Sequence, residues 1–282
     1  MLKDDECIFI ISYNRPNSIH TLKALDEGNV KGKIYIVVSD DDPSLQKYMK
    51  NYQDDIIVFN KKEIASSFDI CDNFDGMIGS VFPRNALNNI AKRLGVKRYC
   101  VLDDDYDRFS YRRCFGGILK GFKCCNLGII LEHCFKYLEK TPQIDCFSFA
   151  QGGDFIGGAD SFSSVGGKRK IMNVFFCQTD KPIKYIGRMN EDVNTYLYYG
   201  QRGKLFFTIN DISIDQKASQ SQDGGMTDLY IYLGTYIKSF YSVIVAPSMV
   251  KVNTIGIQKP RIHHKISWEK VCPKLIREIY KK

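Results

Sequence analysis

The chain has 282 residues, of which 44% are hydrophobic and 13% aromatic, and this composition is typical of a folded globular protein rather than a disordered one. Forty basic and 32 acidic residues give a formal net charge of +8, which is compatible with a polyanionic partner but does not identify one. The ten cysteines form no CxxC pair and several stand inside apolar runs, so we expect free thiols in a reduced, cytoplasmic protein without structural zinc.

The apolar segments predict neither a secretory leader nor a membrane span. Three acidic residues precede the first apolar run in MLKDDECIFI, which disfavours a secretory signal. The longest weakly charged stretch, Leu229–Val250, contains Lys238 and Pro247 and is predicted to form a helix followed by a strand. We therefore expect no membrane contact.

Short β-like runs and helical runs alternate over the first hundred residues. Strands are predicted at Cys7–Ser12, Lys33–Ser39, Asp55–Phe59 and Tyr99–Leu102, and helices at Pro16–Leu25, Asp40–Asn51 and Pro83–Gly95. Such alternation implies right-handed crossovers. The predicted fold class is α/β, a Rossmann-type sandwich with a mainly parallel central sheet and helices on both faces.

The second half shows a different pattern without an obvious linker or repeat. We predict helices at Gly128–Lys140, Glu191–Gln201, Thr227–Phe240 and Ser267–Tyr280, and strands at Cys146–Ala150, Ile171–Phe176, Lys204–Ile209 and Ser242–Val252. The glycine- and serine-rich segment Gln151–Lys170 is expected to be a mobile loop that closes over a substrate or carries an acceptor. One domain over residues 1–282, with a specialised second half, is the simplest account.

Three consecutive aspartates, Asp103, Asp104 and Asp105, directly follow the apolar run of the fourth predicted strand. Adjacent carboxylates repel one another, and a divalent cation held by oxygen ligands relieves this repulsion. Asp103 and Asp105 would point to the same side of an extended segment and could hold one ion, while Asp104 points elsewhere. A solvated acidic turn is the alternative. The position favours a site, because open α/β sheets bind ligands at the carboxyl ends of their strands.

Two further segments have the residue types of a nucleotide site. Ser12, Tyr13 and Arg15 follow the first strand, where Tyr13 could stack on a base and Arg15 could face a phosphate. Arg84 and Asn85 stand at the start of a predicted helix, where backbone N–H groups favour an anion. An ordinary first turn and a surface arginine beside a helix cap explain the two segments equally well.

Glu191 and Asp192 occupy the first turn of another predicted helix. The helix dipole alone explains carboxylates at this position, whereas the alternative is a general base that takes a proton from an attacking hydroxyl.

His263 and His264 are expected to face opposite ways in an extended segment, so at most one could reach the acidic site and help to hold manganese. Histidine pairs also occur as ordinary surface or core residues.

Other sequence features narrow the classes of function. There is neither a GxxxxGK[ST] loop nor a GxGxxG after the first strand, which disfavours P-loop NTPases and dinucleotide dehydrogenases. Basic residues gather at Arg112–Arg113, at Lys168–Lys170 and in KPRIHHK, and each group is either solvated surface or a contact for nucleic acid.

The segments SYNRP, PRNALNNIA, VLDDDYDRF, MNEDVNTY, QSQDGGMTD and RIHHKISW occur in this order over nearly the whole chain. Together they resemble the TET/JBP-associated glycosyltransferases of bacteriophages, a GT-A-fold family that adds sugars to hydroxymethylated pyrimidines in DNA. The resemblance implies a GT-A-like domain with a nucleotide-sugar-binding half at residues 1–110 and an acceptor-binding half at 111–282. A phage protein of this kind would act in the host cytoplasm.

The resemblance also implies roles for individual residues. Asp103 and Asp105 match the metal-binding DxD motif that grips the diphosphate of a nucleotide sugar through Mn²⁺ or Mg²⁺, with Asp104 beside the cofactor. The nucleotide loop would comprise Ser12, Tyr13 and Arg15, with Arg84 and Asn85 near it. Asp192, next to Glu191, would be the base, and His264 or His263 a late metal ligand. Gly224–Asp228 would line the acceptor pocket. Asp105 departs from the family pattern, in which asparagine is frequent, and leaves open which pair binds the ion.

The resemblance implies metal-dependent transfer of a sugar from a nucleotide sugar, expected to be UDP-linked, to DNA whose target base is flipped or single-stranded. The basic residues Lys168–Lys170 and Arg261 would then contact phosphates. Alternatives are the same chemistry on a protein, glycan or lipid, a non-catalytic nucleic-acid-binding protein, and a nucleotidyltransferase.

Overall fold

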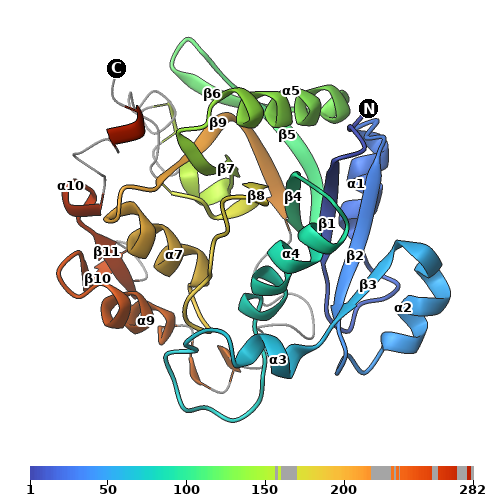
Figure 1. Cartoon of the computed structure of the whole chain (residues 1–282). Helices are drawn as coiled ribbons and strands as arrows, with labels where there is room; N and C mark the ends of the chain where they lie inside the picture. The colour runs from blue at the N-terminus through green and yellow to red at the C-terminus, as the bar shows by residue number, and fades with distance from the viewer. Residues whose placement is uncertain are drawn as a thin grey trace.

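The computed structural model describes residues 1–155, 158–159, 170–216, 230–231, 233–234, 236–255, 260–271 and 278–280. Within these residues a nine-stranded sheet runs through the molecule in the order β3-β2-β1-β4-β8-β7-β9-β5-β6, with helices on both faces (Figure 1). A separate two-stranded sheet, β10-β11, lies near the C-terminal end of the described chain. The predicted α/β fold class, with helices on both faces of a central sheet, is confirmed, and the sheet is mixed.

The first four strands form the parallel half of the sheet. They are β1 (Glu6–Ile11), β2 (Lys33–Ser39), β3 (Ile56–Phe59) and β4 (Arg98–Asp103), and β1 pairs in parallel with both β2 and β4. The predicted strands at these positions are confirmed within one or two residues. Their carboxyl ends share one edge of the sheet, where the chain continues into Ser12, Asp40 and Asp104.

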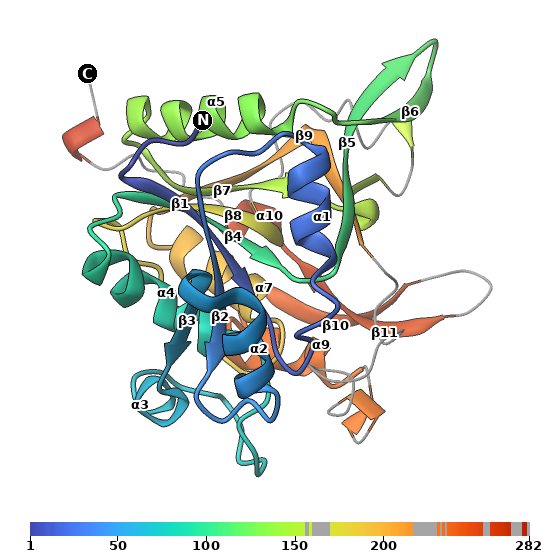
Figure 2. The same cartoon turned by 90° about the vertical axis from the view of Figure 1, so that its right-hand side faces the viewer.

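Successive side chains in β1 enter two different cores, because neighbouring residues of a strand point to opposite faces. Ile8 and Ile10 pack with helices α1 (His20–Glu27), α2 (Leu45–Tyr52) and α5 (Leu127–Lys140). Phe9 and Ile11 pack with α4 (Val81–Arg93), α7 (Glu191–Gly200) and the end of α10 (Trp268–Val271). Figure 2 shows α5 and α1 on one side of the sheet and α4 and α7 on the other. The sheet is therefore buried on both faces.

The second half of the sheet contains most of the antiparallel pairings. The strands β8 (Asn173–Gln178), β7 (Ile144–Ala150), β9 (Leu205–Gln216), β5 (Tyr106–Phe115) and β6 (Ile118–Lys123) follow β4 in space. Only the β7–β9 pair is parallel within this half of the described sheet. The prediction of a mainly parallel sheet therefore holds for the first half alone, since the alternation of strand and helix ends after β4.

The hairpin β5–β6 was not predicted from the sequence. It turns at Gly116 and Gly117, whose positive φ angles of 54° and 79° suit the tight turn of a two-residue hairpin. Its outer part is exposed on both faces, so its strands lack the run of buried apolar residues that identifies a core strand. A short helix, α3 (Lys61–Ala65), was missed as well.

Near the C-terminus two predictions differ from the structure. The apolar run predicted as a strand at Ser242–Val252 begins as helix α9 (Lys238–Val245), and only its end belongs to β10 (Val250–Ile255), which pairs with β11 (Arg261–Ile266). Ser239 and Ser242 are fully buried on α9 whereas Ile244 is 63% exposed, which reverses the usual pattern. Of the helix predicted at Ser267–Tyr280, the described part comprises α10 and the 3₁₀ turn η3 (Glu278–Tyr280).

Several expectations concern residues outside the described part. Gly224–Asp228 and most of Gln151–Lys170 lie there. Within the second segment, Gly152–Phe155 is described and forms a 3₁₀ turn (η2). The nine cysteines among the described residues are all free. No helix in the described ranges has the length and hydrophobicity needed to cross a membrane.

Candidate active site

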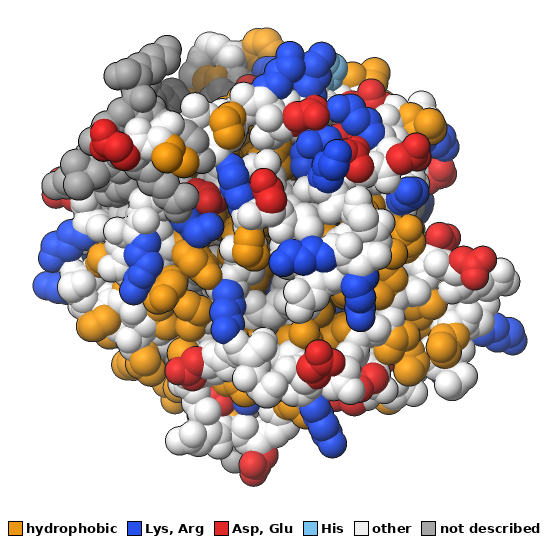
Figure 3. Space-filling view, in the orientation of Figure 1, with side chains coloured by type: hydrophobic (Ala, Val, Ile, Leu, Met, Phe, Trp, Pro, Cys, Tyr) orange, Lys and Arg blue, Asp and Glu red, His pale blue; other side chains and the backbone are white. Residues whose placement is uncertain are grey.

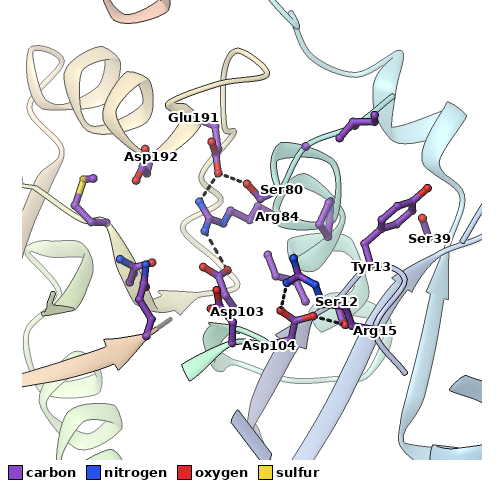
Figure 4. Close-up of a pocket in the computed structure, with 18 of the residues that line it drawn as sticks. Ser12, Tyr13, Arg15, Ser39, Ser80, Arg84, Asp103, Asp104, Glu191 and Asp192 are labelled. Atoms are coloured by element: carbon purple, nitrogen blue, oxygen red, sulfur yellow. Dashed lines mark hydrogen bonds and ion pairs between the residues drawn. The ribbon is translucent and has the colours of Figure 1, made fainter. Parts of the chain in front are cut away.

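A cavity of about 450 Å³ opens at the carboxyl edge of the parallel strands. Polar residues from β1, β2, β4, α4 and α7 contribute to its wall, as Figure 4 shows. Its charged lining residues are Arg15, Lys61, Arg84, Asp103, Asp104, Asp105, Glu191, Asp192 and Lys238. Asp192 lies on one side of the cavity and Tyr13 and Ser39 on the other, with Arg84 and Asp103 between them (Figure 4). Segments that are 180 residues apart in sequence therefore share one site.

Asp104 anchors the loop that follows β1. Its carboxylate accepts hydrogen bonds from the Ser12 hydroxyl at 2.6 Å and from Arg15 Nη1 at 2.9 Å. Burial raises the pKa of Asp104, and the opposing effects of Arg15 and Ser12 partly offset this. Tyr48 closes the arrangement, because its hydroxyl lies 2.7 Å from Ser12 Oγ and accepts the Arg15 N–H at 2.8 Å. Asp104 thus holds Ser12 and Arg15 in place.

Arg84 joins the acidic strand end to helix α7. Its Nη1 donates to Glu191 at 2.5 Å and its Nη2 to Asp103 at 3.2 Å, while Ser80 Oγ donates to the same Glu191 oxygen at 2.5 Å. The guanidinium also lies 4.7 Å from the centre of the Phe175 ring. Burial alone would lower the pKa of Arg84, but Glu191 and Asp103 raise it above its ordinary value. Arg84 is therefore a cationic bridge between two carboxylates.

Asp105 lines the cavity next to Asp103. Burial, together with repulsion from Asp103 and Asp104, raises the pKa of Asp105 to about 7. No salt bridge to Asp105 occurs in the described part of the chain, so its negative charge is poorly compensated there. A divalent cation would compensate it, and two carboxylates plus phosphate oxygens are a common ligand set for Mg²⁺. The two aspartates fit such an ion.

The side chains in the described part of the chain do not by themselves complete a metal centre. Among the described residues, no group of three or more His, Cys, Asp or Glu side chains could hold a metal ion. His264 contacts Asn190, with its Nδ1 3.3 Å from Asn190 Nδ2, and stacks on His263 with the ring centres 4.2 Å apart. Burial and the nearby cations lower the pKa of His264 to about 4. The structure thus places His264 beside the first residues of α7, and metal binding by either histidine stays a prediction.

Asp192 faces the cavity from the first turn of α7. Its Oδ1 accepts the backbone N–H of Val193 at 2.7 Å, whereas its neighbour Glu191 is engaged by Arg84 and Ser80. Burial and the charge of Glu191 raise the pKa of Asp192 to about 7, although Arg84 opposes this. A carboxylate with such a pKa can accept a proton near neutral pH. The two adjacent acids therefore have different surroundings.

Tyr13 and Asn85 were both predicted to lie at the nucleotide, but only Tyr13 lines the cavity. Tyr13 lines the cavity, and its ring lies 4.8 Å from Lys61 Nζ. Asn85 points to a loop instead, because its side chain bonds both the carbonyl and the N–H of Tyr185, at 3.0 and 2.8 Å. Asn85 is absent from the described lining of the cavity, and its predicted role is untested.

Sequence reasoning missed several lining residues. Lys61 follows β3 and pairs with Asp41 at 3.0 Å, and Asp41 in turn accepts a hydrogen bond from Ser39. These residues lie at the carboxyl ends of β2 and β3, so the rule that selected Ser12 could have found them. Tyr230 and Lys238 also line the cavity and carry no comparable local signal. Lys238 is the first residue of α9, which reaches the cavity through its packing on α7.

The layered sheet with a carboxylate-lined cavity at its carboxyl edge defines an α/β enzyme, and the chain is a glycosyltransferase. Its sequence matches the profile of the TET-Associated Glycosyltransferases over residues 7–225, and the chain belongs to this family. The resemblance inferred from the ordered motifs is thereby confirmed. Among curated protein sequences, none matches this chain.

Solved structures of similar fold have very different sequences. Glucosyl-3-phosphoglycerate synthase from Mycobacterium tuberculosis, in complex with Mg²⁺ and UDP, superposes with a TM-score of 0.47 at 8% identity, over 93% of this chain and 87% of that one. The same enzyme with Mn²⁺, UDP-glucose and phosphoglyceric acid gives 0.45 at 9% identity, over 91% and 86%. A nucleotide-diphospho-sugar transferase structure from Desulfovibrio desulfuricans G20 gives 0.38 at 10% identity, over 84% and 98%.

Proposed function

We propose that the protein transfers a sugar from a UDP-sugar to hydroxymethylated pyrimidines in DNA, with the help of a divalent cation. The observation that carries this proposal is that Asp103 and Asp105, at the carboxyl end of β4, line the same cavity as Asp192. Figure 4 shows Asp103 and Asp192 in this cavity. Family membership supports the sugar transfer and suggests DNA as the acceptor.

The side of the cavity nearest β1, β2 and β3 suits the nucleotide of the donor. Tyr13 offers an aromatic face, and Lys61, which is paired with Asp41, offers hydrogen-bond donors to a base edge. Arg15, held at Asp104, supplies positive charge between this end and the acidic pair. A cavity of about 450 Å³ is within the usual range for small-molecule sites.

Asp103 and Asp105 would hold Mn²⁺ or Mg²⁺ together with the donor diphosphate. The bound cation would neutralise the negative charge that develops on the departing nucleoside diphosphate. Arg84 holds Asp103 from the opposite side at 3.2 Å, which fixes the orientation of this carboxylate before a donor arrives.

Asp192 is the proposed general base. It accepts the proton of the attacking hydroxymethyl group, the oxygen forms a bond to the anomeric carbon, and the bond from that carbon to the diphosphate breaks. The released UDP carries away the electron pair of that bond. A base inside a duplex cannot reach the cavity, so the target must be flipped or unpaired.

The metal-dependent step can be tested without an acceptor. We expect slow hydrolysis of a UDP-sugar that requires Mn²⁺ or Mg²⁺ and is lost in Asp103→Asn and Asp105→Asn, because the remaining carboxylate holds the cation and diphosphate poorly. Release of UDP, measured with and without EDTA, checks this. Lys136→Ala, an exposed change on α5, serves as the control. Hydrolysis at the wild-type rate by both aspartate variants would refute the metal site.

The acceptor needs a separate experiment. The enzyme is incubated with Mn²⁺, a panel of nucleotide sugars and DNA that contains hydroxymethylcytosine or hydroxymethyluracil, and the digested nucleosides are analysed by mass spectrometry. A hexose adduct on the modified base supports the proposal. Turnover of the donor without any adduct on DNA would favour a protein, glycan or lipid acceptor. Release of pyrophosphate from a nucleoside triphosphate would indicate a nucleotidyltransferase.

A further inference from the structure

The two-stranded ribbon β10–β11 separates its residues into two faces. Opposed residues of an antiparallel pair share a face, and the register pairs Lys251 with Lys265 and Ile255 with Arg261. Alternation along each strand then places Lys251, Arg261 and Lys265 on the same face. All three side chains are exposed. Neither strand contains an acidic residue, so the charge of this face is uniformly positive.

The opposite face fixes the ribbon against the active site. Val250 is buried in the core that also contains residues of α4 and α7. His264 contacts Asn190, the residue that precedes Glu191 and Asp192, at 3.3 Å. The side-chain amide of Asn190 also donates a hydrogen bond to the backbone carbonyl of Lys238 at 2.9 Å. Because Lys238 and Asn190 line the cavity, His264 of the ribbon contacts the cavity wall through Asn190. The ribbon is therefore attached at the end of the cavity that holds Asp192.

The charges of the ribbon extend to the cavity wall. Lys238 lines the cavity, and burial together with the positive charge of Arg261 lowers its pKa. Figure 2 shows β10 and β11 as a ribbon that extends beyond α9. In Figure 3, Lys and Arg side chains lie on the side where these strands appear in Figure 1, whereas cations and carboxylates alternate near α5. The positive charge of Arg261 on the ribbon therefore acts on Lys238 in the cavity wall.

We propose that this face of β10–β11, formed by Lys251, Arg261 and Lys265, binds the phosphodiester backbone of the DNA that carries the acceptor base. The inference rests on the proposed function and specifies where the polymer lies. Arg261 and Lys265 are four residues apart on one strand, about 13 Å, which matches the axial rise of about four base pairs. Contacts with phosphates position the duplex beside Asp192 without reading its sequence.

The salt dependence of DNA binding tests the proposal. A short labelled duplex with one hydroxymethylcytosine is titrated with the full chain between about 50 and 200 mM salt, and binding is followed by fluorescence anisotropy. The ribbon variant combines Lys251→Ala, Arg261→Ala and Lys265→Ala. We expect its plot of log K against log salt to be shallower than that of the wild type by about three, since each lost phosphate contact removes about 0.9 from the slope.

A matched variant controls for net charge. Lys47→Ala, Lys50→Ala and Lys136→Ala remove three exposed lysines on α2 and α5, so the formal charge of +8 falls by the same amount as in the ribbon variant. This control should keep the wild-type slope. Replacing Lys251 and Lys265 with arginine, which retains the positive charges, should keep it as well.

Two results would overturn the inference: an unchanged slope in the ribbon variant, or an equal decrease in the control variant. Both are independent of the proposed function. If the wild type adds sugar to DNA but the ribbon variant binds like the wild type, only the ribbon assignment fails. If the wild type adds no sugar to any DNA, the proposed function fails, whereas the slopes still decide whether this face binds a nucleic-acid backbone.

Discussion

Replacing Asp192 with asparagine is expected to slow sugar transfer by ~10²–10⁴-fold, because the amide cannot accept the proton of the attacking hydroxyl. The value of kcat/KM for the wild type should rise as pH increases and level off above about 7, the pKa of Asp192, since only the ionised carboxylate acts as a base. Initial rates of transfer to hydroxymethylated DNA between about pH 5.5 and 8.5 check both expectations.

Glu191→Gln is the matched control for this prediction. Glu191 is adjacent in sequence but is held by Arg84 and Ser80, so we expect its replacement to disturb positioning rather than proton transfer. This variant should keep the rise in rate but shift it to lower pH, because the charge of Glu191 no longer raises the pKa of Asp192, whereas Asp192→Asn should lose the rise. The assignment of the base would be wrong if Glu191→Gln removed the rise and Asp192→Asn retained it.

The substitution Asp192→Asn should stabilise the fold at neutral pH. The pKa of Asp192 is about 7 in the folded protein and close to 3.8 in the unfolded chain, so between these values the folded state binds more protons. The contribution of Asp192 to the free energy of unfolding therefore decreases as pH rises from about 4 to 7. Asp192→Asn should show a higher Tm than the wild type at pH 8 and a similar Tm at pH 3.5. A lower Tm at pH 8 would contradict this account.

Arg84→Met should have the largest effect on stability. It removes a buried guanidinium and leaves the carboxylates of Glu191 and Asp103 facing each other without a cation. Removing one partner of a buried ion pair lowers the free energy of unfolding by about 3–5 kcal/mol, because the other charge stays buried without compensation. The free energy of unfolding, measured by urea titration, should fall by this amount, and activity should fall further because Asp103 is no longer held in place.

A double-mutant cycle separates this bridge from ordinary packing. Because Arg84→Met and Glu191→Gln remove the two ends of one interaction, the double variant should lose less stability than the sum of the single variants, with a coupling of about 0.5–3 kcal/mol. Arg98→Met is the control, since Arg98 is another buried, ion-paired arginine but lies at the opposite end of β4. It should destabilise the chain and leave donor hydrolysis intact at low temperature. Additive effects of the first pair would argue against the bridge.

The amino-acid sequence by itself determined the parallel half of the fold and the position of its acidic site. In β1, β2 and β4 the side chains are buried on both faces of the sheet, so each strand is a short apolar run. The change from Leu102 to Asp103 marks the carboxyl end of β4, where α/β sheets bind ligands. The ordered motifs then sufficed to indicate the family, which the match over residues 7–225 confirms.

Local patterns did not determine the second half. The outer part of the hairpin β5–β6 is exposed and lacks a buried face that would produce a periodic signal. The β-branched run Val243–Val245 is helical, and the residues that α9 buries are Ser239, Tyr241 and Ser242. β-propensity depends on the surface against which a segment packs, and that surface is formed by residues distant in sequence.

The tertiary structure alone assigned different surroundings to Glu191 and Asp192. Arg84 is 107 residues from Glu191 along the chain, so no local pattern relates them, yet their contact leaves Asp192 as the acid with the raised pKa. In the same way, only the register of β10 with β11 brings Lys251 beside Lys265. The local sequence pattern indicates which residues are buried, whereas packing between segments that are distant in sequence determines which charged side chains come into contact.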